Sequence, residues 1–126
     1  DLNELDSRMR PIVFEFLARL TEAKIPVLIV TTSRTLEEQA AAVARGVSWT
    51  MKSKHLPQPP ENRSLAIDIV PYSTYQIAGE DKLQWNESDP VWQQIGAIGR
   101  KLNLKWGVTI NGVHKDLGHF EYVPLF

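Results

Sequence analysis

The sequence predicts a small α+β domain in which a few-stranded antiparallel sheet packs against helices. Three observations favour this class: a length of 126 residues, helical spacing of apolar residues in three stretches, and short β-branched runs between them. This length suits one hydrophobic core, so we expect residues 1–126 to form a single domain. The expected order of elements, α-β-α-β-α-β-β, is typical of a sheet covered by helices.

A helix and a strand are expected at the start of the chain. Apolar residues recur at helical spacing in residues 3–23, and Asp6 or Ser7 is expected to cap this helix. Residues 25–32, with the sequence IPVLIVTT, form a continuous apolar run. Such a run is typical of a strand that is buried on both faces.

A second helix and a long loop should follow. Residues 35–46 predict a helix in which Thr35 and Glu38 form a capping box and Gly46 ends the last turn. Residues 47–63 contain three prolines that forbid a regular element, so they are expected to form a loop.

The second half of the chain predicts another strand and another helix. Residues 64–70 read as a strand, and residues 73–87 are polar and irregular. Residues 88–104 predict a helix with Ser88 as its cap. Its apolar face is expected to comprise Val91, Ile95, Ile98 and Leu102.

Two short strands are expected to end the domain. Residues 104–108 (LKWGV) and 118–123 (GHFEYV) are the candidates, with a turn at Asn111–Gly112 between them. In the last run, alternation places His119 and Glu121 on one face of the strand.

Composition excludes several classes of function. The 14 basic and 15 acidic residues give a net charge of −1, which favours neither nucleic acid nor an anionic membrane as a partner. No apolar run approaches the roughly 18–20 residues that span a bilayer. No signal peptide is visible, although one could have been removed. Without cysteine, any metal must be held by His, Asp or Glu.

Asp68 stands inside an apolar strand, where an unpaired carboxylate is strongly unfavourable. One explanation is a salt bridge to Arg34, which follows the preceding strand. The other is a metal site formed with His55 and His119. Two histidines and one carboxylate with open positions suit a catalytic zinc ion, and Asp116 is close enough in sequence to act as a general base. Spacing alone leaves both explanations open.

Two separated segments resemble the M15 family of zinc peptidases. The segments are SKH…LAIDIVPY and KWG…DLGHFEY, and TTSRTLEEQ is similar to the family's arginine segment. The family includes D-Ala-D-Ala carboxypeptidases and dipeptidases, and phage-type L-alanyl-D-glutamate endopeptidases that cut peptidoglycan stem peptides. The likeness runs over nearly the whole chain and implies the peptidase fold that this family shares with hedgehog proteins, with a zinc site in a cleft.

The resemblance also implies roles for individual residues. His55, Asp68 and His119 would bind one Zn²⁺ per chain. Asp116 would be the general base, and Arg34 would bind the substrate carbonyl oxygen as negative charge develops on it. Substrate-binding roles are expected for Ser53, Gln39, Tyr72 and Trp106.

The chain departs from the family pattern in the loop between two expected ligands. His55 and Asp68 are thirteen positions apart because PQPPENRS lies between them, and Ser64 replaces the family's glycine. The insertion is expected at the edge of the cleft, where it would reshape substrate access. The usual WGGxW segment reads WGVTINGV, and His114 is expected at the rim.

The expected function is zinc-dependent hydrolysis of peptidoglycan stem peptides, by an L-alanyl-D-glutamate endopeptidase. A D-Ala-D-Ala carboxypeptidase or dipeptidase is the alternative with the same chemistry. A zinc-stabilised binding module without catalysis is the alternative from another class. We expect a monomer that acts on the bacterial cell wall, in the periplasm, outside the cell, or after release from a host cytoplasm if phage-encoded.

Overall fold

The structure, a computed structural model, describes residues 1–46, 53–72, 86–110 and 113–124, the side chains of 108–110 and 113–114 excepted. The expected turn at Asn111–Gly112 lies outside these residues, as do most of the stretch 73–87 and the side chain of His114. The elements are a short 3₁₀ helix (Leu2–Glu4), α1 (Arg10–Glu22), β1 (Val27–Thr31), α2 (Leu36–Ala44), β2 (Ala66–Pro71), α3 (Val91–Lys101), β3 (Lys105–Ile110) and β4 (Val113–Glu121). Fold class and element order are as predicted.

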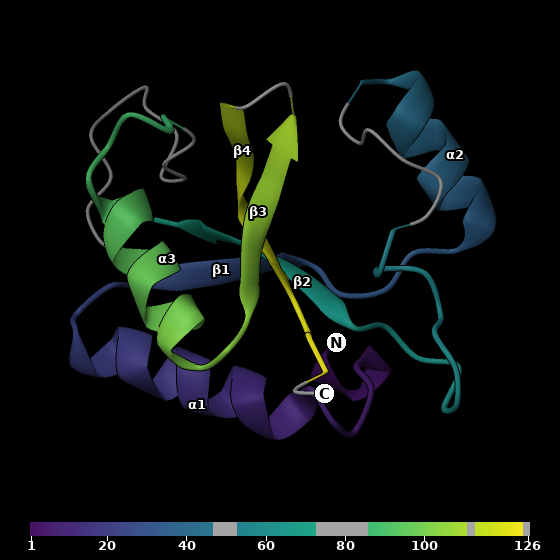
Figure 1. The fold of residues 1–126 in the computed structure, drawn as a ribbon, viewed down its shortest axis with the longest axis horizontal. Helices are drawn as coiled ribbons and strands as arrows, with labels where there is room; N and C mark the ends of the chain where they lie inside the picture. The colour runs from purple at the N-terminus through teal and green to yellow at the C-terminus, as the bar shows by residue number, and fades with distance from the viewer. Residues whose placement is uncertain (47–52, 73–85, 111–112, 125–126) are drawn as a thin grey trace.

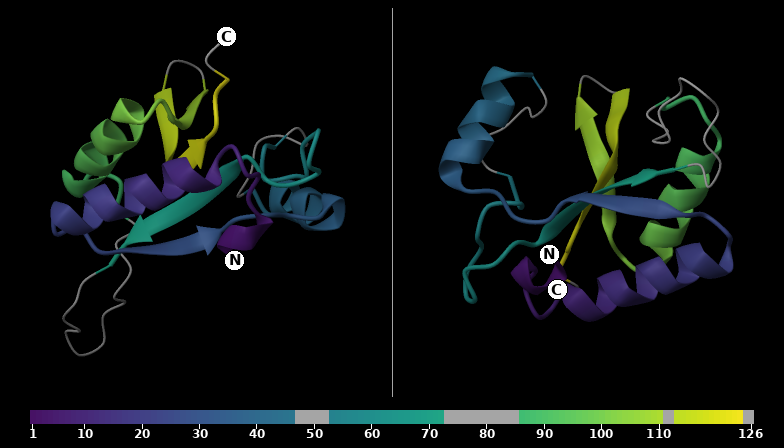
Figure 2. Two further views of the ribbon diagram at one scale, coloured as in Figure 1. Left: turned by 90° about the horizontal axis from the view of Figure 1, so that it is seen from below. Right: turned by 180° about the vertical axis from the view of Figure 1, so that it is seen from behind.

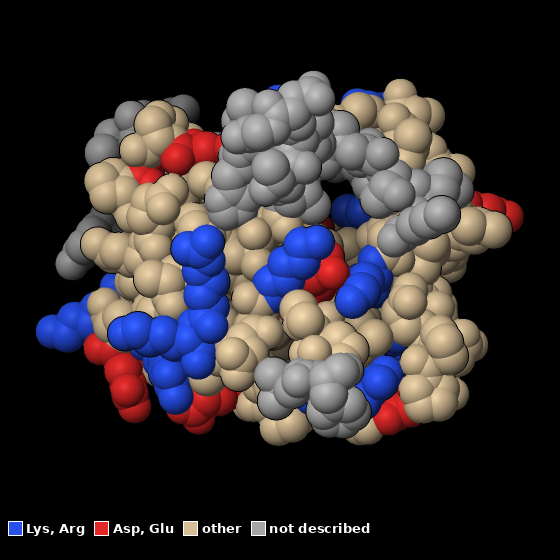
Figure 3. All heavy atoms as spheres, in the orientation of Figure 1, with Lys and Arg blue, Asp and Glu red and all other residues tan. Residues whose placement is uncertain are grey.

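The strands form one antiparallel sheet with the order β1-β2-β4-β3. The helices α1 and α3 pack on one face of the sheet, and α2 lies apart from them (Figure 1, Figure 2). No helix in the described part of the chain is long and apolar enough to cross a bilayer. Acidic and basic side chains lie close together on the face seen in Figure 3, in keeping with the small net charge.

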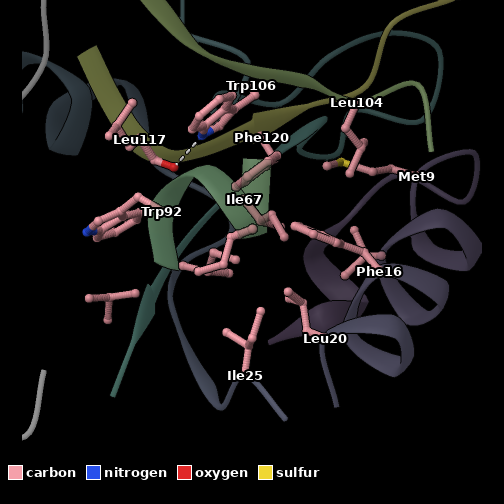
Figure 4. Packing of buried hydrophobic residues seen from close by; sticks show 14 of the residues in the cluster. Met9, Phe16, Leu20, Ile25, Ile67, Trp92, Leu104, Trp106, Leu117 and Phe120 are labelled. Atoms are coloured by element: carbon pink, nitrogen blue, oxygen red, sulfur yellow. Dashed lines mark hydrogen bonds between the residues drawn. The ribbon is translucent and has the colours of Figure 1, made fainter. Parts of the chain in front are cut away.

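The hydrophobic core lies between the sheet and the two helices α1 and α3 (Figure 4). The rings of Phe16 on α1 and Phe120 on β4 pack with their centroids 4.8 Å apart. Two glycines allow α3 to approach the sheet closely. A Cβ on Gly96 would lie 2.4 Å from the Trp106 ring, and one on Gly99 would lie 2.5 Å from Phe120.

The cap predicted for α1 is wrong. The helix begins at Arg10, and neither Asp6 nor Ser7 caps it through its side chain. The buried Asp6 carboxylate instead accepts hydrogen bonds from the backbone and guanidinium of Arg8, 2.8–2.9 Å long. The side-chain hydrogen bond from Arg8 lowers the pKa of Asp6. Asp6 therefore organises the turn before the helix rather than the helix end.

The prediction that β1 is buried on both faces is also wrong. β1 is an edge strand, and Leu28 and Val30 on its outer face are about half exposed. A continuous apolar run gives no information about which faces other elements cover. The two middle strands of the sheet are β2 and β4, and the apolar run of β2 is more buried than that of β1.

Helix caps were predicted correctly in α2 and incorrectly in α3. Thr35 and Glu38 form the expected capping box, and Gly46 adopts a positive φ of 73° just beyond the helix. In α3 the Ser88 side chain does not cap the helix; the Asp89 carboxylate accepts the Val91 N–H at 2.9 Å. The buried residues of α3 are Trp92, Ile95, Gly96 and Gly99. The buried face therefore begins at Trp92, one position after Val91, where the predicted apolar face began.

The insertion between the two expected ligands packs on the N-terminal segment of the chain. The Ser7 backbone and hydroxyl donate to the Glu61 carboxylate, and Arg8 donates to the Pro59 carbonyl at 3.2 Å. Arg63 donates to a backbone carbonyl in the 3₁₀ helix. These contacts anchor the loop on the segment before α1.

Candidate metal centre and active site

Two neighbouring strands place Asp68 and His119 side by side. Asp68 on β2 is the cross-strand partner of His119 on β4, and Thr31 on β1 pairs with Asp68 on the other side. Because side chains alternate along a strand, Asp68 and His119 lie on the face opposite Ile67 and Phe120. The sheet register thus brings a carboxylate and an imidazole together away from the core.

His55 joins them from the loop that precedes β2. Its ring Nδ1 lies 2.9 Å from the Thr32 carbonyl oxygen, and its own carbonyl accepts the Arg34 N–H at 3.0 Å. Ser64 donates its hydroxyl to the same Thr32 carbonyl at 2.6 Å. The imidazole is buried, with only 1% of the residue exposed. The backbone after β1 therefore fixes the position and orientation of His55.

The three side chains converge on one point. His55 Nε2 and His119 Nδ1 each lie 3.1 Å from Asp68 Oδ1. One candidate ligand atom from each residue lies within 4.8 Å of the other two. His55 Nε2 is buried and makes no hydrogen bond in the described part of the chain, despite this short distance. A buried nitrogen without a hydrogen bond is unfavourable, and a metal ion among the three groups would satisfy it.

Charges in the cluster shift the pKa values of its members. Burial raises the pKa of Asp68, but the hydrogen bond with His119 and the close approach of the His55 ring outweigh it and hold this pKa well below the ordinary value. Burial lowers the pKa of His119, but its hydrogen bonds with Asp68 and Glu121 raise it to about 9. The two hydrogen bonds of His119 thus favour its protonated form, and a metal ion bound at Nδ1 would take the place of the proton there.

Arg34 takes part in the same cluster. Its Nη2 lies 3.5 Å from Asp68 Oδ2, and its Nη1 donates to Gln39 Oε1 at 3.1 Å. The salt bridge between Asp68 and Arg34 that spacing allowed is thus present. It uses the second oxygen of Asp68, so the salt bridge and the convergence on His55 and His119 coexist.

Asp116 lies at an irregularity in β4. The pairing of β3 with β4 shifts between Trp106 and Val108, and Asp116 has a positive φ of 58°. Asp tolerates this conformation better than most residues do. Burial, together with the nearby charge of Asp68, raises the pKa of Asp116. The bend thus directs a carboxyl group with raised proton affinity toward the cluster.

A cavity of about 340 Å³ lies beside these groups. Arg34, Asp68 and Asp116 line it, and so does the buried Trp92 of α3, which sequence reasoning did not assign to the site. The helical pattern placed Trp92 next to the predicted apolar face, but it gave no sign that α3 borders the cavity. Among the residues that the structure describes, the cavity is also lined by Val30, Thr31, Ile69, Glu87, Leu117 and Gly118, none of them from the insertion.

The four predicted substrate-binding residues lie in different places. Gln39 is fully buried and supports Arg34, and Ser53 Oγ accepts the His55 N–H at 3.1 Å. Trp106 is 8% exposed, and its indole N–H donates to the Leu117 carbonyl at 2.7 Å (Figure 4). Tyr72 borders a separate groove next to the C-terminal end of α1. None of the four lines the cavity, so direct substrate contact stays a prediction.

The donor set fits a zinc ion. Zinc in catalytic sites takes three protein ligands from imidazole nitrogens and carboxylate oxygens and keeps an open position. His55 Nε2, His119 Nδ1 and Asp68 Oδ1 are of these types and converge. The other ring nitrogen of each histidine contacts an oxygen, the Thr32 carbonyl or the Glu121 carboxylate, as is usual for metal-binding histidines.

Comparisons with known structures agree with this geometry. A crystal structure of the L-Ala D-Glu endopeptidase ChiX from Serratia marcescens is similar, with a TM-score of 0.67 and 19% identity over 97% of this chain and 83% of that one. VanYB in complex with D-alanine-D-alanine is also similar, with a TM-score of 0.57 and 16% identity over 96% and 72% of the two chains. At these identities the likeness establishes the fold.

Comparisons of sequence identify the family. No curated protein sequence matches the chain. The family described as phage L-alanyl-D-glutamate peptidase matches residues 3–120, which is nearly the whole chain and includes every residue of the cluster. The M15-like resemblance of the two motifs is thereby confirmed, and the chain belongs to the phage L-alanyl-D-glutamate peptidase family of peptidoglycan hydrolases.

Proposed function

We propose that the protein is a zinc-dependent endopeptidase that hydrolyses the L-Ala-D-Glu bond of peptidoglycan stem peptides. The observation that carries this proposal is the convergence of His55 Nε2, His119 Nδ1 and Asp68 Oδ1 beside a cavity lined by Asp116 and Arg34. Family membership supports the choice of bond. We further propose that residues 1–126 act as one domain and as a monomer.

His55, Asp68 and His119 would hold the zinc ion. When bound there, zinc supplies a Lewis acid that lowers the pKa of a water molecule toward about 7 and polarises a carbonyl group. The sheet keeps the three ligands in place, since Asp68 and His119 lie in adjacent strands and His55 is fixed to the Thr32 carbonyl. A binding site held in this way needs little rearrangement when metal enters.

Asp116 is the proposed general base. Its carboxylate borders the cavity and takes the proton of the attacking water, then passes it to the leaving amine. A raised pKa suits this role, because a base whose pKa lies nearer the working pH accepts a proton more readily. Asp116 lies on the β4 bend, three residues before His119, and is not one of the three residues that would hold the metal.

Arg34 is the proposed group that stabilises the reacting carbonyl. The guanidinium is held by Gln39 on one side and Asp68 on the other, and it borders the cavity. A fixed cation there would bind the carbonyl oxygen as negative charge develops on it. A binding module without catalysis would need neither Arg34 nor Asp116, and this favours an enzyme.

Digestion of purified peptidoglycan fragments tests the proposal. Zinc-loaded protein should release L-Ala-terminated fragments and expose a new amino terminus on D-Glu, which labelling and mass spectrometry identify. Release of free D-Ala would show a carboxypeptidase instead. Absence of any cleavage would mean that this chain lacks the peptidase activity of its family, and it would contradict the proposal.

Asp116→Asn is the matched variant for the same assay. Asn tolerates a positive φ as Asp does, so the bend in β4 should persist. We expect turnover to fall by about 10²–10⁴-fold, the usual contribution of a general base, with zinc still bound. Unchanged turnover would remove Asp116 from this role.

A further inference from the structure

We propose that Glu121, held in place by Lys54, is a positioning residue that orients His119 for metal binding. The inference rests on the proposed metal centre, but it concerns residues outside the ligand set. Sequence alternation placed Glu121 on the same face as His119 without giving it a role. Lys54 precedes His55 in the loop and had no role either.

The contacts form a continuous chain from the loop to the ligand. Glu121 Oε1 lies 2.9 Å from His119 Nε2, and Glu121 Oε2 lies 3.5 Å from Lys54 Nζ. Lys54 Nζ also donates to the Tyr122 carbonyl at 3.2 Å. Both carboxylate oxygens are thus engaged, and the lysine is tied to the backbone next to Glu121.

This arrangement decides which nitrogen of His119 faces the cluster. A neutral imidazole has one N–H and one lone pair, and an ionised carboxylate only accepts hydrogen bonds. When a metal takes the place of the Nδ1 proton, Glu121 against Nε2 holds the remaining proton on Nε2 and leaves the lone pair on Nδ1. Nδ1 is the nitrogen that lies 3.1 Å from Asp68 Oδ1. Glu121 therefore selects the ring form that a metal at the cluster requires.

His55 is oriented by the same principle with a different partner. The Thr32 carbonyl can only accept, so Nδ1 of His55 carries the proton and Nε2 carries the lone pair. One histidine is thus oriented by a backbone carbonyl, and the other by a charged side chain. Only the second arrangement can be removed by substitution without altering the main chain.

Burial explains why Glu121 needs Lys54. Side-chain exposures are 8% for His119 and 12% for Glu121, against 34% for Lys54. A carboxylate this deeply placed is unfavourable without a cation beside it once the imidazole is neutral. Lys54 supplies that cation, and it couples the loop that carries His55 to the strand that carries His119. Lys105, opposite Glu121 on β3, also acts on Glu121 by its charge, but no ion pair between the two occurs in the described residues.

Zinc affinity of four variants tests the proposal. Dissociation constants are measured by competition with a chromophoric chelator at fixed pH and salt, after circular dichroism has verified folding. Glu121→Ala should weaken zinc binding by about 10–100-fold, the usual effect of losing such a partner. Glu121→Gln, which keeps an acceptor without the charge, should weaken it less. Lys54→Met should also weaken it, whereas Lys105→Met should stay within about twofold of wild type.

Nitrogen-15 spectra of the histidine rings give an independent readout. Wild-type protein should show a slowly exchanging Nε2–H of His119, because Glu121 holds it, and Glu121→Ala should lose this signal. The proposal is overturned if the Glu121 variants bind zinc as wild type does, or if Lys105→Met matches Lys54→Met. Wild-type protein that binds zinc but cuts no peptidoglycan would refute the proposed function alone, and a flat affinity series in an active enzyme would refute only the role of Glu121.

Discussion

At the scale of single residues, the site depends on how one carboxylate is compensated. Asp68 contacts two imidazoles through Oδ1 and a guanidinium through Oδ2. The apolar sequence around Asp68 showed that compensation was required, but not which partners would supply it. The side chains named in both explanations, Arg34 in one and the two histidines in the other, contact Asp68, because a carboxylate has two oxygens and the structure uses them separately.

The stability of the metal-free protein should depend on pH through His119. Its folded pKa of about 9 lies above the ordinary value of 6.5, so its stabilising contribution is complete below pH 6.5 and is lost as pH rises through about 9. The lowered pKa of Asp68 acts at the other end, where stability is lost as pH falls below the ordinary value of 3.8. Denaturant unfolding at several pH values measures both.

Zinc should reverse the trend at the alkaline end. Metal binding needs a deprotonated Nδ1, so stabilisation by zinc should increase over the range in which the metal-free protein weakens. His119→Gln is the control, and its metal-free profile should be flatter above pH 6.5. A metal-free wild type equally stable at pH 6.5 and 9.5 would contradict this account of the cluster.

At the scale of elements, sequence patterns predicted a feature correctly where residues a few positions apart in the chain make the whole interaction. The capping box of α2 needs only Thr35 and Glu38, and it was predicted correctly. The burial of β1 depends on which elements cover it, and its prediction failed. The cap of α1 failed because Asp6 bonds to Arg8 instead, a competition that spacing alone does not decide.

The contact of α3 with the sheet gives a test at this scale. Replacing a helical glycine by alanine usually stabilises a helix by about 1 kcal/mol. At Gly99 the added Cβ would lie 2.5 Å from Phe120, so Gly99→Ala should instead destabilise the protein by about 1–3 kcal/mol. The exposed Gln94→Ala on the same helix should change stability by about 0.5 kcal/mol or less. Denaturant unfolding compares the two, and a stabilised Gly99→Ala would show that α3 is not closely packed there.

At the scale of the whole molecule, the sequence specified the fold class and the ligand types, but not their assembly. His119 and Asp68 are far apart in the chain and meet only through the register of β2 and β4. The insertion was expected at the cleft, yet its described contacts anchor it on the N-terminal segment. Trp92 lines the cavity and was missed, whereas Trp106 was predicted and does not line it, because the sequence pattern does not show which aromatic residue borders an opening.

The central claim is that His55, Asp68 and His119 form a metal centre, and zinc content tests it most directly. Elemental mass spectrometry of the purified protein, equilibrated with Zn²⁺ and freed of excess metal, should find one zinc ion per folded wild-type chain. Asp68→Asn, measured in parallel with its folding verified, should retain far less. Wild-type protein without zinc, or an Asp68→Asn variant that retains it in full, would contradict the account.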